Sequence, residues 1–455
     1  MSQFSVTGLH VVVVGAARSG VAAATLVASR GARVTLSDAR AAVGNAESLQ
    51  TIGIALELGG HRSKTFEAAD LIVLSPGVSP RLPLVARARA EGVPVISEIE
   101  LAARWLRGRI VAVTGTKGKS TTTVLAGRML DAGGCRAVVG GNIGAALSSQ
   151  VDDSTPDAIH VVEVSSFQLE LTETFRPWIA VCLNLSPDHL DRHASFEEYV
   201  DAKARIFANQ TKEDAMVINA DDPRVLEIAR SGRARALQFA VSRNLEEGVH
   251  VTAEAISHRS ADRERPLVPL SAVQLPGRHL LSDVVAAAAV GTLAGVAPDA
   301  MTRAVQSFVG LEHTLEFVAE HDGVRFVNDS KATNVASARA AIECFGQGLV
   351  VILGGRFKGG TLADLRAPLA SRGASVVALG EARPLIHEAV AGAVSIADAE
   401  TMADAVAAGR RLGRPGGTVL LAPACASLDM FRDYAERGRA FKEEVNRLGR
   451  GAGER

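Results

Sequence analysis

The chain is poor in cysteine and aromatic residues, and it has no excess of charge of either sign. It holds four cysteines, Cys135, Cys182, Cys344 and Cys425. They are scattered without a CxxC pair, which argues against a disulfide framework and a cysteine-based metal centre. Lys and Arg total 49 and Asp and Glu total 50, for a formal net charge of −1. This balance provides no general field to hold nucleic acid or an anionic membrane, so it favours small-molecule substrates.

Long hydrophobic runs and targeting signals are also missing. The first residues lack the basic start and the apolar core of a signal peptide. The longest apolar stretch, 284–297, stops at Pro298, short of the length of a bilayer span. We therefore expect a cytoplasmic protein that does not enter the membrane.

The chain does have enough apolar sequence for several cores. It contains 455 residues, of which 47% are hydrophobic, and a single core stops growing at roughly 250–300 residues. Short apolar runs alternate with helical segments, the pattern of parallel α/β sheets. We expect three α/β domains. They are a Rossmann-like N-terminal domain at 1–97, a central P-loop ATPase-like domain at 98–309 and a Rossmann-like C-terminal domain at 310–455.

The expected strands are short apolar runs that end in glycine or polar turns. They are 10–14, 32–36 and 71–74 in the first domain, 109–113, 158–163 and 179–184 in the second, and 323–327, 349–353, 375–379 and 418–422 in the third. Helices are expected at 21–29, at 98–106 and from Asp283 onward. The polar stretch 242–265 fits neither pattern.

A glycine loop between an apolar strand and a helix is the strongest local signal. It reads Thr114-Gly115-Thr116-Lys117-Gly118-Lys119-Ser120-Thr121. Backbone N–H groups at such a helix N-terminus bind phosphate oxygens, while the lysine neutralises phosphate charge and the serine hydroxyl ligates magnesium. The spacing is shorter than that of a standard Walker A loop, which needs glycine where Val113 stands. The loop predicts an ATP site in which Lys119 and Ser120 have these roles.

A second glycine loop, 15–20, resembles a dinucleotide fingerprint whose middle glycine is replaced by Ala17. The added methyl group keeps the backbone farther from a pyrophosphate, which argues against NAD. Arg18 and Ser19 can still bind phosphate, and Asp38 at the end of the next strand can reach a ribose or a base. The loop fits either a nucleotide-diphosphate group or a purely structural turn.

Three polar clusters follow in the central region, around Asn142, Glu163 and 188–191. Glu163 ends an apolar strand, where a carboxylate is costly to bury without a cation, and magnesium is the obvious candidate. His189 suits a metal ligand or a general base, although a loop histidine is more often simply solvated. Lys203 lies on an expected amphipathic helix, where composition alone predicts a surface charge.

The last third of the chain places polar segments after three expected strands, at 328–334, 354–360 and 422–427. Parallel α/β sheets bind ligands at the carboxyl ends of their strands. Cations and hydroxyl groups gathered at one edge suit a dicarboxylate.

In this order, and over nearly the whole chain, these motifs resemble those of the Mur ligases. The loop Thr-Gly-Thr-x-Gly-Lys-Ser-Thr matches the family's ATP loop. The segments 328–334 (Asn-Asp-Ser-Lys-Ala-Thr-Asn) and 423–429 (Pro-Ala-Cys-Ala-Ser-Leu-Asp) are similar to those of the D-glutamate-adding members. The Asp-Asn-Pro-Arg motif of the diaminopimelate-adding members is absent from the sequence.

The resemblance implies an ATP-dependent amide ligase of peptidoglycan precursor synthesis. Its substrates would be UDP-N-acetylmuramoyl-L-alanine and D-glutamate, in addition to ATP. It would use two Mg2+ ions, or Mn2+ in their place, and it would be a monomer. A carboxylate is a poor electrophile, so ATP would first convert it to an acyl phosphate while metal ions offset the charge. The amine of D-glutamate would then attack, and a tetrahedral intermediate would collapse to the amide.

The resemblance also implies domain and residue roles. The N-terminal domain would bind the UDP group, the central domain ATP and the C-terminal domain the incoming amino acid. The catalytic residues would be Lys119, Glu163, His189 and Lys203, and the metal ligands Ser120, Glu163, His189 and Lys203, the last as a carbamate. ATP would contact Gly115, Thr116, Lys117, Gly118, Lys119, Ser120, Thr121, Asn142, Asp283 and Asp329. The UDP group would contact Arg18, Ser19, Asp38, Arg40, Ser75 and Gly77, and D-glutamate would contact Lys331, Thr333, Lys358, Ser427, Leu428 and Tyr434.

Three positions depart from the family pattern. The motif Gly-x-His-Asn-x-x-Asn usually precedes the Ala-rich helix, whereas 277–283 has Leu280 and Asp283 in place of the asparagines. Asp283 accepts hydrogen bonds but cannot donate them, which predicts an altered nucleotide preference. Thr314 stands where the family has arginine. We hypothesise that Lys117 supplies the missing cation.

Three other functions remain open on the sequence. A folylpolyglutamate synthase shares the ATP core but does not need the 15–38 unit or the segment 328–334. A catalytically weak nucleotide sensor would rest on Thr314, and an NAD oxidoreductase on the loop 15–20. The intact set of implied catalytic residues favours the ligase.

Overall fold

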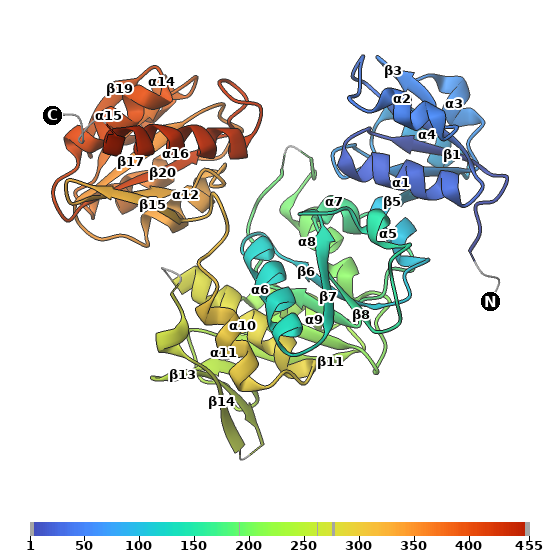
Figure 1. Cartoon of the computed structure of the whole chain (residues 1–455), viewed down its shortest axis with the longest axis horizontal. Helices are drawn as coiled ribbons and strands as arrows, with labels where there is room; N and C mark the ends of the chain where they lie inside the picture. Colours follow the sequence, from blue (N-terminus) through green and yellow to red (C-terminus); the bar gives the residue numbers. More distant parts are fainter. Residues whose placement is uncertain (1–3, 191, 262, 275–277, 451–455) are drawn as a thin grey trace. The chain divides into compact units, whose positions relative to one another are not determined.

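The computed structural model describes residues 4–190, 192–261, 263–274 and 278–450. Their contacts divide the chain into two compact units. The first unit comprises Met1–Val273 and Ser282–Ser307, and the second comprises Gln274–Leu281 and Phe308–Arg455. The named strands form three sheets (Figure 1). The α/β fold with three sheets is therefore confirmed, while the domain boundaries at residues 97 and 309 remain predictions.

Five parallel strands form the first sheet, in the order β3-β2-β1-β4-β5. The strands are β1 (His10–Val14), β2 (Arg33–Asp38), β3 (Ala55–Leu58), β4 (Leu71–Leu74) and β5 (Val95–Ser97), with helices α1 (Arg18–Ser29), α2 (Ala46–Thr51), α3 (Ser63–Glu67) and α4 (Pro83–Ala90). All five residues of β1 are buried. A central parallel strand covered on both faces reads as an unbroken apolar run, which is why the sequence predicts it.

Nine strands form the second sheet, in the order β14-β13-β12-β11-β10-β9-β6-β8-β7. The strands are β6 (Arg109–Thr114), β7 (Arg136–Gly141), β8 (Ala158–Glu163), β9 (Ile179–Cys182), β10 (Ala215–Asn219), β11 (Arg235–Ala240), β12 (Gly248–Val251), β13 (Ala255–Ser260) and β14 (Arg263–Pro269). The helices of this region are α5 (Glu98–Ala103), α6 (Lys119–Ala132), α7 (Ser166–Leu169), α8 (Phe196–Ala204), α9 (Pro223–Ala229), α10 (Arg278–Leu293) and α11 (Pro298–Gln306). The unassigned stretch 242–265 proves to contain β12, β13 and part of β14, of which β13 pairs antiparallel with both neighbours.

Six strands form the third sheet, in the order β15-β16-β20-β17-β18-β19. The strands are β15 (Glu316–His321), β16 (Val324–Asn328), β17 (Leu349–Gly354), β18 (Ser375–Leu379), β19 (Ser395–Ala399) and β20 (Thr418–Ala424). The helices are α12 (Val335–Ile342), α13 (Arg366–Ala370), α14 (Arg383–Val390), α15 (Met402–Leu412) and α16 (Tyr434–Arg450). Only β15 pairs antiparallel among these strands, so the predicted mostly parallel sheet is confirmed.

Strand order brings the motif loops together within each sheet. In the second sheet β6 lies between β8 and β9 and is parallel to both. In the third sheet β20 lies between β16 and β17 and is parallel to both. Parallel neighbours end at the same edge, where α/β sheets bind ligands. The fold therefore collects the central motifs at one edge and the C-terminal motifs at another.

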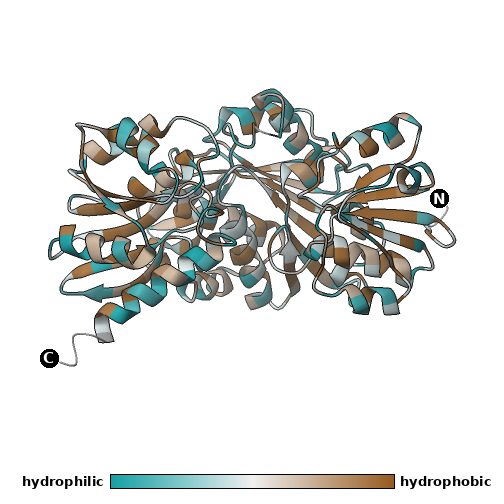
Figure 2. Ribbon diagram, turned by 90° about the horizontal axis from the view of Figure 1, so that it is seen from above, coloured by the Kyte–Doolittle hydropathy of each residue, from teal (hydrophilic) through white to brown (hydrophobic). Residues whose placement is uncertain are grey.

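Hydropathy follows this layering, with hydrophobic strands flanked by helices that carry hydrophilic residues (Figure 2). Among the residues that the structure describes, no helix combines the length and apolar character needed to cross a membrane. The apolar run 284–297 instead contributes to α10, whose residues Val284 to Val290 are all fully buried.

Candidate active site

The phosphate-loop candidate connects β6 to α6. Gly115 and Gly118 adopt positive φ angles of 151° and 82°. The Lys119 side chain folds back over the loop, where its Nζ donates to the carbonyl oxygens of Gly115 at 3.0 Å and Thr116 at 2.9 Å. A cation and the N-terminus of a helix thus lie at one place, which is the requirement for binding phosphate.

Glu163 at the end of β8 joins this loop to the strand β7. The Ser120 hydroxyl donates to Glu163 Oε2 at 2.5 Å, and Asn142 Nδ2 donates to Glu163 Oε1 at 2.8 Å. Glu163 is 3% exposed. A hydroxyl and a carboxylate are oxygen donors of the kind that Mg2+ prefers, so these two residues fit the implied ion. Three of the predicted site residues are therefore in direct contact.

Lys203 is buried, contrary to the surface charge that composition alone predicts. Its side chain is on α8 and the residue is 1% exposed. Nζ donates to the Gly115 carbonyl at 2.8 Å and lies 3.3 Å from Thr114 Oγ1. Burial, and secondarily the charge of Lys119, lowers the pKa of Lys203 well below its ordinary value. A lowered pKa favours the unprotonated amine, which is the nucleophilic form of lysine.

His189 lies on the loop after β9 with a positive φ of 55°. Its ring packs edge-on against Phe167, with centroids 4.9 Å apart, and its Nε2 is 3.9 Å from Asp188 Oδ2. The role of His189 as a metal ligand remains a prediction. Asp191 and Gly277, which belong to two of the sequence motifs, lie outside the described residues, as do the side chains of Arg278 and His279.

The loop 15–20 packs tightly against the end of β4. Ser75 Oγ donates to the Gly15 carbonyl at 2.8 Å, and a Cβ on Gly20 would lie only 1.7 Å from that carbonyl oxygen. Asp38 accepts from the Ala16 amide at 2.5 Å and from Nε and Nη2 of Arg40, each at 2.9 Å. The hydrogen bond from Arg40 is the largest influence that holds the pKa of Asp38 below its usual range. Two predicted UDP-binding residues thus form an ion pair with each other.

In the second unit, Asp329 and Ser330 follow β16, and a residue that the sequence did not suggest organises this loop. Arg437 on α16 is 1% exposed and donates to Ser330 Oγ at 3.0 Å, the Ser330 carbonyl at 2.9 Å and the Cys425 carbonyl at 3.1 Å. Burial lowers the pKa of Arg437 to about 10. No local sequence signal marks it, because an arginine on an amphipathic helix reads as a surface charge.

Five of the predicted D-glutamate residues lie on the loops that follow β16, β17 and β20, and the sixth, Tyr434, is the first residue of α16. Ser427 is buried, Lys331 and Thr333 are half-buried, and Lys358, Leu428 and Tyr434 are exposed. The segment with the Thr314 departure lies before β15, where Glu312, His313 and Glu316 come close together. Lys442 Nζ lies 3.1 Å from Glu312 Oε1 and 2.5 Å from Glu316 Oε1. Both carboxylates therefore form ion pairs with the Lys442 ammonium.

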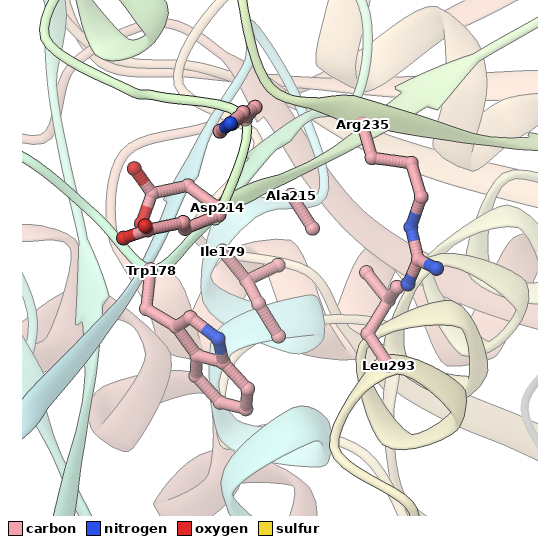
Figure 3. Close-up of a pocket in the computed structure, with 8 residues that line it drawn as sticks. Trp178, Ile179, Asp214, Ala215, Arg235 and Leu293 are labelled. Carbon is pink, nitrogen blue, oxygen red and sulfur yellow. The ribbon is translucent and has the colours of Figure 1, made fainter.

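A separate cavity of about 290 Å³ lies at the opposite edge of the second sheet (Figure 3). It is lined by Trp178, Ile179, Lys212, Glu213, Asp214, Ala215, Arg235 and Leu293. These residues include the first positions of β9, β10 and β11, whereas the phosphate loop follows the last position of β6. None of the predicted site residues lines this cavity, which excludes it as the site that the motifs describe.

Three family models match the chain in sequence order. The Mur ligase MurD-like N-terminal domain matches residues 9–97, the Mur ligase middle domain residues 113–291, and the Mur ligase glutamate ligase domain residues 315–425. The curated UDP-N-acetylmuramoylalanine--D-glutamate ligase of Acidobacterium capsulatum is 46% identical over 443 residues, which cover 96% of each chain. The ligase of the same name from Koribacter versatilis is 43% identical over 446 residues, covering 97% of this chain and 98% of the relative.

Solved structures show the same fold at low sequence identity. UDP-N-acetylmuramate-alanine ligase MurC from Thermotoga maritima has a TM-score of 0.62 at 18% identity, covering 96% of this chain and 99% of its own. MurF from Acinetobacter baumannii has a TM-score of 0.60 at 16% identity, covering 85% and 93%. Family models, full-length relatives and fold agree, and the chain belongs to the Mur ligase family of enzymes.

Proposed function

We propose that the chain is the ATP-dependent ligase that joins D-glutamate to UDP-N-acetylmuramoyl-L-alanine during peptidoglycan precursor synthesis. The observation that carries this proposal is the end-to-end similarity to curated D-glutamate ligases, at 42–46% identity over at least 96% of the chain. The hydrogen bonds of Lys119 to the loop and of Ser120 to Glu163 support it, because they gather a cation and oxygen donors for magnesium at one sheet edge.

The proposed domain roles follow the three sheets. Residues 1–97 would bind the UDP group through Arg18, Ser19, Asp38, Arg40, Ser75 and Gly77. Residues 98–309 would bind ATP through the loop 115–121 together with Asn142 and Asp283. Residues 310–455 would contribute Asp329 to ATP binding and hold D-glutamate through Lys331, Thr333, Lys358, Ser427, Leu428 and Tyr434.

The residues of the phosphate loop would carry out the first half of the reaction. Lys119 and the N-terminal amides of α6 would hold the phosphate groups, and phosphoryl transfer to the substrate carboxylate would give an acyl phosphate. Magnesium, as two ions or with Mn2+ in their place, would supply charge neutralisation when bound. Ser120, Glu163 and His189 would hold the metal, together with Lys203 once carbon dioxide has converted its neutral amine to a carbamate.

The second half of the reaction is amide formation. The amine of D-glutamate would attack the acyl carbon, and the tetrahedral intermediate would expel phosphate. Holding both reactants in line contributes on the order of several kcal/mol to such a step. The reaction consumes one ATP and releases ADP and phosphate for each amide bond formed.

The test is ATP-dependent phosphate release with magnesium and UDP-N-acetylmuramoyl-L-alanine. D-glutamate, L-glutamate, meso-diaminopimelate and L-lysine are offered in separate reactions, and the product is weighed by mass spectrometry. We expect release with D-glutamate alone and a product heavier by one glutamyl unit. Lys119→Ala should abolish release, whereas Lys212→Ala, at an exposed position, should leave it unchanged. Release with another amino acid moves the chain to a sibling ligase, and no release with any of them contradicts the proposal.

A further inference from the structure

Arg81 and Arg192 link the domain of the first sheet to helix α8, which carries Lys203, and to the loop after β9, which carries His189. Arg81 Nη1 donates to the Arg192 carbonyl at 2.9 Å, and Arg81 Nη2 pairs with Glu198 Oε1. Arg192 reaches in the opposite direction, where Nη2 donates to the Val78 carbonyl at 2.5 Å and Nη1 to the Gly77 carbonyl at 3.4 Å. We call Arg81, Arg192 and Glu198 the arginine clamp.

One end of the clamp touches the proposed UDP site. Gly77 and Val78, whose carbonyls accept hydrogen bonds from Arg192, lie two and three residues after Ser75, which donates to the Gly15 carbonyl. Gly15 is closely packed against this segment, because a Cβ on Gly15 would lie 2.8 Å from Val78 Cγ2 and 2.9 Å from Ser75 Cβ. In a close-packed contact of this kind, a ligand that shifts or orders the loop 15–20 must act on the segment 75–78 as well.

The other end of the clamp sets the position of α8. Glu198 is in the first turn of this helix, where its amide donates to the N-cap Ser195 Oγ at 3.1 Å and its Oε2 accepts from the Ala194 amide at 2.6 Å. Lys203 is in the last turn of the same helix. Between them, the Tyr199 hydroxyl lies 3.0 Å from Thr116 Oγ1 of the phosphate loop. Any displacement of this one short helix therefore moves Lys203 and the contact to the phosphate loop together.

A second branch of the clamp leads to His189. The Arg192 guanidinium stacks over Phe167, 4.3 Å from the ring centroid. The Phe167 ring also contacts two histidines: His193 is stacked with a centroid distance of 5.4 Å, and His189 is edge-on at 4.9 Å. An arginine over an aromatic face is an attractive contact with a defined geometry. Arg192 thereby joins the carbonyls of the 75–78 segment to the ring against which His189 packs.

We infer that the arginine clamp couples occupation of the UDP-substrate site to the nucleotide site, with Arg81, Arg192 and Glu198 as positioning residues that touch neither reactant. The inference rests on the proposed function for the identity of the two ligands. It gives the enzyme a physical means of organising the phosphate loop only when the acceptor carboxylate is present, which would suppress hydrolysis of ATP alone. A contiguous chain of contacts becomes coupling only when a thermodynamic cycle demonstrates it.

The experiment measures that cycle by titration calorimetry on the full chain. The dissociation constant of the non-hydrolysable analogue AMP-PNP with Mg2+ is determined with and without saturating UDP-N-acetylmuramoyl-L-alanine, and the ratio of the two is the coupling factor. Linkage requires the same factor for the UDP substrate measured with and without nucleotide. Arg81 and Glu198 have side-chain exposures of 51% and 35%, so we expect Arg81→Ala to reduce the coupling factor only about three- to fivefold.

Three variants make the result specific. Glu198→Gln keeps an acceptor for the Ala194 amide but removes the charge, and the double variant Arg81→Ala/Glu198→Gln should lose no more coupling than Arg81→Ala alone, because the two residues share one interaction. Arg87→Ala is the matched control, since Arg87 is 52% exposed and pairs with Glu67 and Glu91 within its own domain. It should leave the coupling factor unchanged.

The outcomes separate the clamp from the proposed function. Binding of both ligands with a coupling factor of one, or with a factor that Arg81→Ala leaves intact, overturns the clamp and leaves the proposed function standing. Loss of affinity for each ligand alone in Arg81→Ala, with the ratio preserved, also overturns it, because a merely structural role would give that result. Failure of the unmodified chain to bind the UDP substrate refutes the proposed function, and the clamp with it.

Discussion

At the scale of single residues, the burial of Lys203 carries a cost in stability. Its amine is buried beside the Gly115 carbonyl, and desolvation lowers its pKa well below the ordinary value. The unfolded chain keeps the ordinary pKa and binds the proton more tightly, so at neutral pH this residue favours unfolding, and the penalty disappears as the pH rises towards the unfolded value. The proposed role of Lys203 as a carbamate that ligates metal would explain why this cost is tolerated.

We therefore expect Lys203→Met to raise the melting temperature in buffer depleted of carbon dioxide, and to lower the ligation rate by more than about a hundredfold, the scale seen when a group that stabilises a transition state is lost. Calorimetry and phosphate release check the two effects. Lys212→Met replaces an exposed lysine and should change neither. A ligation rate within threefold of the unmodified chain would remove Lys203 from the proposed machinery.

Single residues also show which contacts could not be predicted from the sequence. The contacts of Ser120 and Asn142 with Glu163 follow from strand order, whereas the sequence placed these residues in one site only through the family resemblance. The burial of Lys203 and Arg437 was not readable, because each is on a helix with polar neighbours and is buried by elements distant in sequence. The pairing of Asp38 with Arg40 was likewise not anticipated, since both were assigned to the ligand.

At the scale of elements, the junction between β6 and α6 depends on a glycine for two separate reasons. Gly118 has a φ of 82°, and a Cβ there would lie 2.0 Å from Asp283 Oδ1. Gly134, just after the same helix, has a φ of 83° but nothing within 4 Å of its Cβ position. The two glycines share backbone strain and differ in steric contact, which makes them a matched pair.

Gly118→Ala should weaken binding of the magnesium nucleotide by more than about tenfold, since either the loop or the buried Asp283 side chain must shift to admit the methyl group, while affinity for the UDP substrate stays unchanged. Gly134→Ala should lower the unfolding free energy by about 1 kcal/mol from strain at positive φ and leave nucleotide affinity intact. Titration calorimetry and urea unfolding provide both numbers. Equal nucleotide affinities in the two variants would mean that the contact with Asp283 has no influence on the loop.

The start of β6 is held by a buried polar network centred on His160 of β8. Ser154 Oγ accepts from the amides of Arg107 and Gly108, at 3.0 and 3.1 Å, and lies 2.9 Å from His160 Nε2. Gln150 Oε1 lies 2.7 Å from Nδ1 of the same ring. The acceptor Oε1 fixes a proton on Nδ1, so the neutral ring uses Nε2 to accept from Ser154. Protonating His160 would break that arrangement.

Burial lowers the pKa of His160, so the unfolded chain, with a histidine pKa of about 6.5, takes up the proton first as the pH falls. The contribution to stability is therefore complete above pH ~6.5 and is lost below it. We expect the unfolding free energy to fall from pH 7.5 to pH 5.5, and to fall less steeply in His160→Gln, as measured by urea titration at both values. His387→Gln, at a half-buried histidine on the protein surface whose side chain is 45% exposed, should keep the slope of the unmodified chain. Parallel slopes in all three would exclude His160 as the source.

Element prediction succeeded where one physical signal dominated. The buried parallel strands β1, β4, β8 and β18 were predicted with their observed bounds, because both of their faces are apolar. The hairpin of β13 and β14 was missed because its sequence is rich in charged residues and lacks a clear apolar pattern. The four consecutive residues from Arg263 to Pro266 are all exposed. Its register is set by pairing with neighbours rather than by its own hydrophobic pattern, so the segment alone could not reveal it.

At the scale of the whole molecule, the division into units does not follow the chain order. Residues 274–281 belong to the second unit although the residues on both sides belong to the first. Leu280, one of the departures from the family motif, is 3% exposed and part of the core cluster that contains Leu315, Val335 and Leu353. A leucine at this position is therefore explained by packing, which the sequence comparison alone could not show.

This assignment predicts that unfolding of the two units can be separated and that Leu280 affects only one of them. Both tryptophans, Trp105 and Trp178, are in the first unit, so their fluorescence follows that unit alone, whereas far-ultraviolet circular dichroism follows both. Leu280→Ala creates a cavity in the second core and should cost about 2–5 kcal/mol there. In urea we expect the dichroism transition to begin earlier while the fluorescence midpoint stays constant.

Leu385→Ala provides the control, because Leu385 is also in the second unit but is 44% exposed, and it should leave both signals in place. If Leu280→Ala instead moves the fluorescence midpoint as far as the dichroism midpoint, the eight residues 274–281 unfold with the first unit. The two units would then be one cooperative structure, and the leucine would need an explanation other than the packing of the second core.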